Sequence, residues 1–167
     1  MIEELMNEKV LGVKVYDWQK VQLNEVLEKL GYTVPDETDL KKLFRKLKPE
    51  DITPLITDTV CDVMGISFDS VKIQYKRKGN RAGDVVKVRQ FIVYYLHKFH
   101  KTLTLGDCGL VVGSKRRHAK EHLKDLGDHS VVLYYLGRVE GGININDQSV
   151  TSWIDAIDRE LIKRLNA

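Results

Sequence analysis

Three observations predict an all-α protein, built as a helical bundle, from this chain of 167 residues. Apolar residues recur at helical spacing in one segment after another. Ser, Thr, Asp or Pro stands where most of these segments begin, and Gly stands where several end, which is typical of capped helices. No uninterrupted apolar stretch approaches ~18 residues, so we expect no membrane span.

Residues 1–50 are expected to form a small helical N-terminal region. The apolar residues of 16–30 fit one helical stripe, and Gly31 is placed to end it. A second helix is expected to start at Pro35 and to stop before Pro49, because the residue that precedes a proline disfavours helix.

The middle region, residues 51–140, is expected to fold as one helical domain. Its first helix is expected to begin at Thr53-Pro54, since threonine can cap a helix and proline suits the first turn. Gly65 would end this helix, and Ser67 would cap a short helix after it.

Two capped helices are expected further along the same domain. Asp84 would cap a long helix over 85–100, whose apolar residues follow the helical period. Thr104 would cap the next helix, with Asp107 three residues later completing a capping box, and Gly113 would end it.

The rest of the chain predicts one insert and two more helices. The basic insert 114–126 is expected to be helical, and Asp128 is expected to cap a helix that ends near Arg138. In the C-terminal region, 141–167, two glycines and an Asn-rich run predict a loop. An amphipathic helix over 147–165 would then pack on the domain.

The charge distribution points to a polyanionic partner. The formal net charge is only +3, but residues 72–124 hold 14 Lys and Arg against 3 Asp and Glu. The remainder of the chain has a net charge of −8. A basic middle between acidic flanks indicates a local surface for a polyanion.

The motifs of enzymes and cofactor-binding proteins are missing from the sequence. There is no GxxxxGK[ST] loop and no GxSxG, and the adjacent residues Asp128-His129-Ser130 cannot face one another as a catalytic triad. We therefore expect a protein that is not an enzyme and has no cofactor.

We also expect no metal site and no disulfide. His118 and His122 lie four residues apart, but no Cys pair at finger spacing and no HExxH accompanies them. The residues that would have to complete a tetrahedral site are Cys108, His97 and His100. Cys61 and Cys108 are expected to be reduced, buried thiols. With an acidic start that lacks a signal-peptide core, this favours a cytoplasmic protein.

The two capped helices on either side of the insert favour a helix-turn-helix that binds double-stranded DNA. In such a motif the first turn of the second helix meets base edges in the major groove. Asp128 could accept from a cytosine amino group, His129 and Ser130 could donate or accept, and Val131 would suit a thymine methyl.

Basic residues around this motif are placed for the DNA backbone and the minor groove. Arg81 could enter the minor groove, where negative potential favours arginine. It belongs to a basic, glycine-containing loop that we expect over residues 75–83, whose other candidates for DNA contact are Lys76, Arg77 and Lys78. The residues placed to meet phosphates or bases from neighbouring segments are Lys87, Arg89, Gln90, Lys115, Arg116 and Arg117.

Several segments between Ile52 and Val139 resemble the DNA-binding C-terminal domain of the bacterial replication initiator DnaA and its phage-encoded relatives. These segments are ITPLITDTVCDVMGIS, DVVKVRQFIVYYLHKF, LTLGDCGLVVG and GDHSVVLYYLGRV. The resemblance implies a Trp-repressor-like helical domain in which Asp128, His129 and Ser130 read bases. It also implies that Arg81, Arg89 and Gln90 touch DNA and that the backbone at Leu105 approaches a phosphate.

The sequence departs from this family in four ways. Val131 replaces a threonine, and the insert SKRRHAKEHLKDL replaces a short glycine-arginine turn. His97 stands where a basic residue is expected, and the ATPase module of the family is missing. An alternative alignment of RRHAKEHL with the signature would put Glu121 at a buried apolar position, which GDHSVVLYYL fills with Val132.

These patterns favour sequence-specific binding of double-stranded DNA in replication initiation or transcriptional control. Replication proteins are possible further partners. One alternative is an adaptor of the replication machinery that kept the fold without DNA readout. RNA binding is another, although Tyr75 is the one aromatic residue in the basic loop for stacking on single strands.

Overall fold

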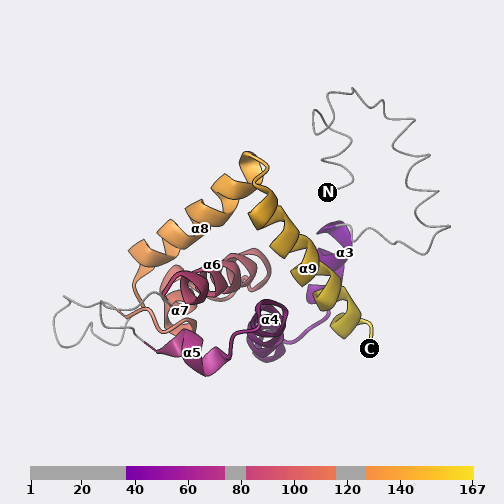
Figure 1. The fold of residues 1–167 in the computed structure, drawn as a ribbon. Helices are drawn as coiled ribbons and strands as arrows, with labels where there is room; N and C mark the ends of the chain where they lie inside the picture. Colours follow the sequence, from indigo (N-terminus) through magenta and orange to yellow (C-terminus); the bar gives the residue numbers. More distant parts are fainter. Residues whose placement is uncertain (1–36, 74–81, 116–126) are drawn as a thin grey trace, which may run out of the picture.

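The computed structural model describes residues 37–73, 82–115 and 127–167 (Figure 1). This part of the chain is all helical, as expected, and has no strand beyond an isolated bridge between Lys115 and Gly127. Its seven helices are α3 (Glu37–Phe44), α4 (Pro49–Met64), α5 (Phe68–Lys72), α6 (Ala82–Phe99), α7 (Leu105–Val111), α8 (His129–Asn144) and α9 (Gln148–Leu165). The helix expected over 16–30 lies outside the described residues.

Helix α6 is the centre of the bundle. It packs against α4, α5, α7 and α8, while α9 closes the other side against α3, α4 and α8. Its inward side chains Val88, Ile92 and Leu96 are fully buried. Phe99 stacks on Phe44 with ring centroids 4.3 Å apart, so α3 belongs to the same core. None of the described helices is long and apolar enough to cross a membrane.

Helix α4 begins at Pro49, four residues before the start expected from sequence. Lys48 is extended and makes no side-chain cap, and proline fits the first position because the N–H it lacks would have no partner there. Pro54 therefore lies inside the helix rather than at its start. Thr53 is likewise a helical residue and not the cap, and its carbonyl accepts from the Thr57 hydroxyl at 3.0 Å. The expected end is confirmed, since Gly65 adopts φ +67°.

Helix α6 also begins earlier than expected, at Ala82. Asp84 lies in its first turn, not before it, where a carboxylate still complements the helix dipole. Ala82 and Gly83 are consequently helical rather than part of the basic loop, and the rest of that loop, 75–81, lies outside the described residues.

Helix α8 continues through the glycine pair that was expected to form a loop. A Cβ atom on Gly142 would lie 2.6 Å from Cγ2 of Val150, so a glycine is needed where α9 crosses α8. The turn is reduced to 145–147, and Asp147 caps α9 by accepting from the N–H of Ser149 at 2.9 Å. Helix α8 thus continues across residues 140–141, where the middle region was expected to end. Helix α4 likewise continues across residues 50–51, where that region was expected to begin.

Candidate nucleic-acid interface

Helices α7 and α8 pack closely because glycines line their contact. A Cβ atom on Gly109 would lie 3.2 Å from the backbone nitrogen of Asp128 and 3.3 Å from Cγ2 of Val132. A Cβ atom on Gly127 would overlap the carbonyl oxygen of Gly106. Sequence reasoning missed these residues, although two glycines three apart within one short helix are a detectable signal of close packing.

The two ends of the insert meet beside this contact. The N–H of Asp128 donates to the carbonyl of Ser114 at 2.9 Å, and Lys115 forms an antiparallel bridge with Gly127. Residues 116–126 between them lie outside the described part of the chain. The placement of α8 on α7 is therefore fixed by direct contact of the flanking residues, whatever the length of the insert.

The first turn of α8 is capped and open to solvent. The Oδ1 atom of Asp128 accepts from the N–H groups of Ser130 at 3.1 Å and Val131 at 3.4 Å, which confirms the expected cap. His129 and Ser130 are exposed, whereas Val131 is half-buried against the core. Val132 is fully buried, as the preferred alignment of the signature required.

Helix α7 begins with the expected capping box. The N–H of Thr104 donates to Asp107 at 2.9 Å, and the N–H of Asp107 donates to the Thr104 hydroxyl at 3.2 Å. The Thr104 hydroxyl also donates to Asp107 at 2.6 Å, and this bond, followed by the one from the Thr104 N–H, lowers the pKa of Asp107 below its ordinary value. Leu105 is the first helical residue, where an N–H has no partner inside the helix.

Arg89 is turned toward α5. Its Nε atom donates to the carbonyl of Val71 at 2.8 Å, and Nη2 donates to the carbonyls of Val71 at 2.5 Å and Ile73 at 2.6 Å. The guanidinium thus satisfies carbonyls at the end of a short helix. A DNA contact by Arg89 would have to use its remaining N–H groups, while Lys87 is exposed and Gln90 half-buried.

The end of α5, which precedes the basic loop, lies close to the residues that precede the insert 114–126. A Cβ atom on Gly113, whose φ is +71°, would overlap the carbonyl oxygen of Lys72, so the end of α5 abuts the end of α7. Lys115 is exposed two residues later. The other basic candidates lie outside the described residues: Lys76, Arg77, Lys78, Arg81, Arg116 and Arg117.

His118 and His122 lie outside the described residues, and in the part of the chain that the structure describes, His, Cys, Asp and Glu form no metal-binding group. His100 is buried, with Nε2 2.9 Å from the Pro49 carbonyl oxygen and Nδ1 3.1 Å from the Thr102 hydroxyl. His97 is exposed. Burial raises the pKa of the Cys108 thiol to about 11, so it is protonated at neutral pH.

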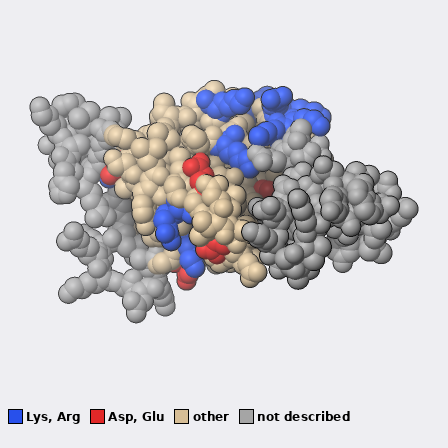
Figure 2. Space-filling view, turned by 90° about the horizontal axis from the view of Figure 1, so that it is seen from above, with Lys and Arg blue, Asp and Glu red and all other residues tan. Residues whose placement is uncertain are grey.

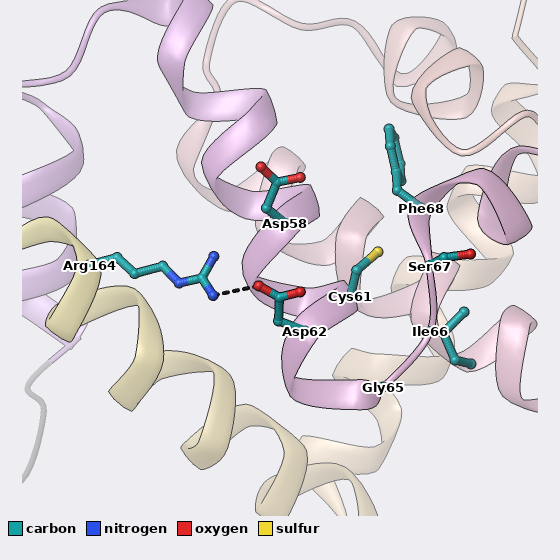
Figure 3. A pocket seen from close by; sticks show the side chains of 8 residues that line it. All are labelled: Asp58, Cys61, Asp62, Gly65, Ile66, Ser67, Phe68 and Arg164. Carbon is teal, nitrogen blue, oxygen red and sulfur yellow. Dashed lines mark hydrogen bonds and ion pairs between the residues drawn. The ribbon is translucent and has the colours of Figure 1, made fainter.

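A shallow hollow of about 430 Å³ lies away from this interface, between α4 and α9 (Figure 3). Arg164 crosses its rim and donates to Asp62 at 2.6 Å, which ties the end of α9 to α4. Burial, with the nearby Asp58 and Asp62, raises the pKa of Cys61 to about 11. The Cys61 thiol is therefore protonated at neutral pH. Its lining is Asp58, Cys61, Asp62, Gly65, Ile66, Ser67, Phe68 and Arg164.

Comparison of the chain with protein-family models, with curated proteins and with solved structures gives no match. The resemblance to the DNA-binding domain of DnaA accordingly rests on the motif residues alone, now set on the α7–α8 pair.

Proposed function

We propose that this protein binds double-stranded DNA in a sequence-specific way, without catalysis, and acts in replication initiation or transcriptional control. The observation that carries the proposal is the start of α8. Its first turn is exposed at His129 and Ser130, and its base is held on α7 by backbone contacts at Gly109 and Gly127. A rigidly held, open helix start is what readout in a major groove requires.

The chemistry of this turn suits base edges. Asp128 uses Oδ1 to cap the helix, so its second carboxylate oxygen is placed to accept from an amino group of a base. The exposed cations Lys87 and Lys115 would contact phosphates on either side and supply most of the affinity.

An adaptor role is the second candidate, favoured by apolar side chains further along α8. Leu133 and Tyr134 are 53% and 60% exposed on the solvent side of the helix. Exposed apolar side chains on one helix face suit a protein partner.

The test is a selection of duplexes from a random pool, followed by anisotropy titrations of the selected and a scrambled duplex over a range of salt concentrations. His129→Ala should weaken binding to the selected duplex by roughly tenfold to a hundredfold and leave the scrambled duplex nearly unaffected. Ser152→Ala, at an exposed position on α9, is the matched control and should change neither.

Equal affinity of the wild type for every duplex, unchanged in His129→Ala, would rule out readout by α8. Undetectable salt-sensitive affinity for any duplex, together with a stable protein complex that Leu133→Ser disrupts, would establish the adaptor role.

A further inference from the structure

A second concentration of basic residues lies on α3, outside the basic middle of the sequence. Residues 41–48 include five Lys and Arg and no acidic residue. Leu40 and Phe44 are buried in the core, so the basic side chains lie on the outer side. All five are exposed: Lys41, Lys42, Arg45, Lys46 and Lys48.

The end of α6 adds to this surface. Phe99 stacks on Phe44, and the His100 ring lies 2.9 Å from the Pro49 carbonyl oxygen. These contacts bring the exposed Lys101 and the half-buried Lys98 beside the basic run. Together the seven residues are called the α3 basic surface. Figure 2 shows Lys and Arg side chains gathering along one edge of the molecule, with few acidic side chains among them.

Ion pairs and helix dipoles do not account for four of these charges, those of Arg45, Lys46, Lys48 and Lys101. Arg45, Lys46 and Lys101 have no ion pair within the described residues, and the nearest acid to Lys48 is Glu50 at 3.9 Å, with both side chains exposed. A helix dipole favours cations in the last turn of α3 but not at residues 46, 48 and 101.

The surface fits a phosphate backbone better than a membrane. An amphipathic helix binds a bilayer through its apolar face, and the apolar side chains Leu40 and Phe44 are already buried against α6 and α9. What the run 41–48 offers is a series of exposed cations, which is how proteins bind nucleic acid without reading bases.

This surface is separate from the start of α8. Helix α6 has 18 residues, or about 27 Å at ~1.5 Å per residue. Arg89, in the first half of α6, bonds to α5. Helix α3 instead packs against the last turn of α6, where Phe44 stacks on Phe99. Figure 1 accordingly shows α5 and α7 on one side of the bundle and α3 on the other.

We propose that the α3 basic surface binds the backbone of a second stretch of DNA while the start of α8 reads the first. The proposal rests on the proposed function. It makes the protein a bridge between two DNA segments, which belong either to one bent molecule or to two separate duplexes.

The experiment immobilises the selected duplex, saturates it with the full chain, and measures capture of a fluorescent duplex of unrelated sequence. Arg45→Glu/Lys46→Glu should reduce this capture roughly tenfold or more, while its affinity for the selected duplex changes little. Lys101→Glu, on a different segment, should reduce capture in the same direction. Energy transfer between the labelled ends of one long duplex tests binding within one molecule.

Two controls isolate the surface. Arg45→Lys/Lys46→Arg keeps the charges and should capture the second duplex as the wild type does. Arg159→Glu/Lys163→Glu reverses the same number of charges at exposed positions of α9, and should retain capture. Thermal unfolding of each variant checks that the fold is intact.

The outcomes separate the two proposals. If capture and energy transfer are both unchanged in Arg45→Glu/Lys46→Glu, the bridge is refuted while readout by α8 stands. If the wild type captures the second duplex but His129→Ala does not change the preference for the selected duplex, DNA binding by the α3 basic surface stands and readout by α8 is refuted. If the wild type captures no second duplex at low salt but binds labelled polyglutamate in a way that Arg45→Glu/Lys46→Glu abolishes, the DNA assignment is overturned in favour of an acidic protein partner.

Discussion

Asp128 shows how a single side chain can belong both to the fold and to the proposed readout. Its Oδ1 atom holds the first N–H groups of α8, and its position at the open helix start places it against an approaching base. The two roles can be separated chemically, because an amide retains the capping oxygen but lacks the negative charge.

Asp128→Asn should therefore leave the free energy of unfolding within about 0.5 kcal/mol of the wild type, whereas Asp128→Ala should lower it by about 1 kcal/mol. Urea denaturation measures both changes. If Asp128 accepts from a cytosine amino group, a duplex selection with Asp128→Asn should return a different base at that position. An unchanged selection would show that Asp128 serves as a cap alone.

Residue roles were predictable from sequence where the partner is near in the chain. The caps at Ser67, Thr104 and Asp128 are confirmed because each bonds to a group two or three residues away. Arg89 is different. Its partners are carbonyls 16 and 18 residues away, and no local pattern indicates that an arginine turns toward the end of another helix.

At the scale of elements, the close packing of α7 on α8 depends on glycine residues. The contact at Gly127 leaves no room for a methyl group, whereas an added Cβ on Gly137, exposed in the middle of α8, meets nothing within 4 Å. The two glycines form a matched pair for mutation.

Gly127→Ala should destabilise the protein by roughly 2 kcal/mol or more, because the methyl would overlap the backbone of Gly106. Gly137→Ala should stabilise it by about 0.5–1 kcal/mol, because alanine loses less backbone entropy in a helix. Thermal or chemical denaturation of both variants measures these changes in the free energy of unfolding. Equal effects of the two substitutions would contradict the close packing of α7 on α8.

The closed ends of the insert make its interior dispensable for the fold. Replacing residues 116–126 with Asn-Gly should preserve the helical circular dichroism and raise the free energy of unfolding by about 1 kcal/mol, since a shorter loop costs less entropy to close. Preference for the selected duplex should remain, with a shallower salt dependence from the lost cations. Unfolding of this variant would show that α8 depends on the insert.

Element types were predictable within the described residues, but several helix boundaries were not: α3 ends at Phe44 rather than just before Pro49, and the starts of α4 and α6 and the end of α8 also differ. Pro49 marks the true start of α4, yet Thr53-Pro54 carries an equally good local start signal. Helix α8 continues past its two glycines because α9 packs on Gly142, a contact with a residue in another helix. Local propensity gave way to tertiary packing in that case.

At the scale of the whole molecule, one buried pair joins the central helix to the last one. The hydroxyl of Tyr95 donates to Asp158 at 2.5 Å, with the Ile154 carbonyl oxygen 3.3 Å away. Burial, together with the Asp158 charge, raises the pKa of Tyr95 well above its ordinary value of 10.0.

A group whose pKa is higher in the folded than in the unfolded chain contributes its full stabilisation at any pH below its unfolded pKa. This contribution is lost as the pH rises from the unfolded pKa toward the folded pKa. Above pH ~10 the unfolded chain releases the Tyr95 proton and the folded chain keeps it, so stability should fall by roughly 1.4 kcal/mol per pH unit from this group. Urea unfolding at pH 8, 10 and 11 tests this. Tyr95→Phe should be less stable at pH 8, and its deficit should shrink at pH 11. A deficit that stays constant with pH would contradict the assignment.

The charge pattern was predictable only in part at this scale. The sequence outside residues 72–124 has a net charge of −8. This single value does not show that residues 41–48 carry five Lys and Arg. Their gathering with Lys98 and Lys101 depends on the Phe44–Phe99 stack, a contact between residues 55 positions apart.

The abutment of Gly113 on the Lys72 carbonyl has a kinetic consequence. It brings the exposed Lys72 next to the end of α7, which the exposed Lys115 follows two residues after Gly113. An approaching polyanion would meet their combined field before any base is touched, and such steering acts on encounter more than on retention. In stopped-flow measurements, raising the ionic strength should slow association with the selected duplex far more steeply than it speeds dissociation.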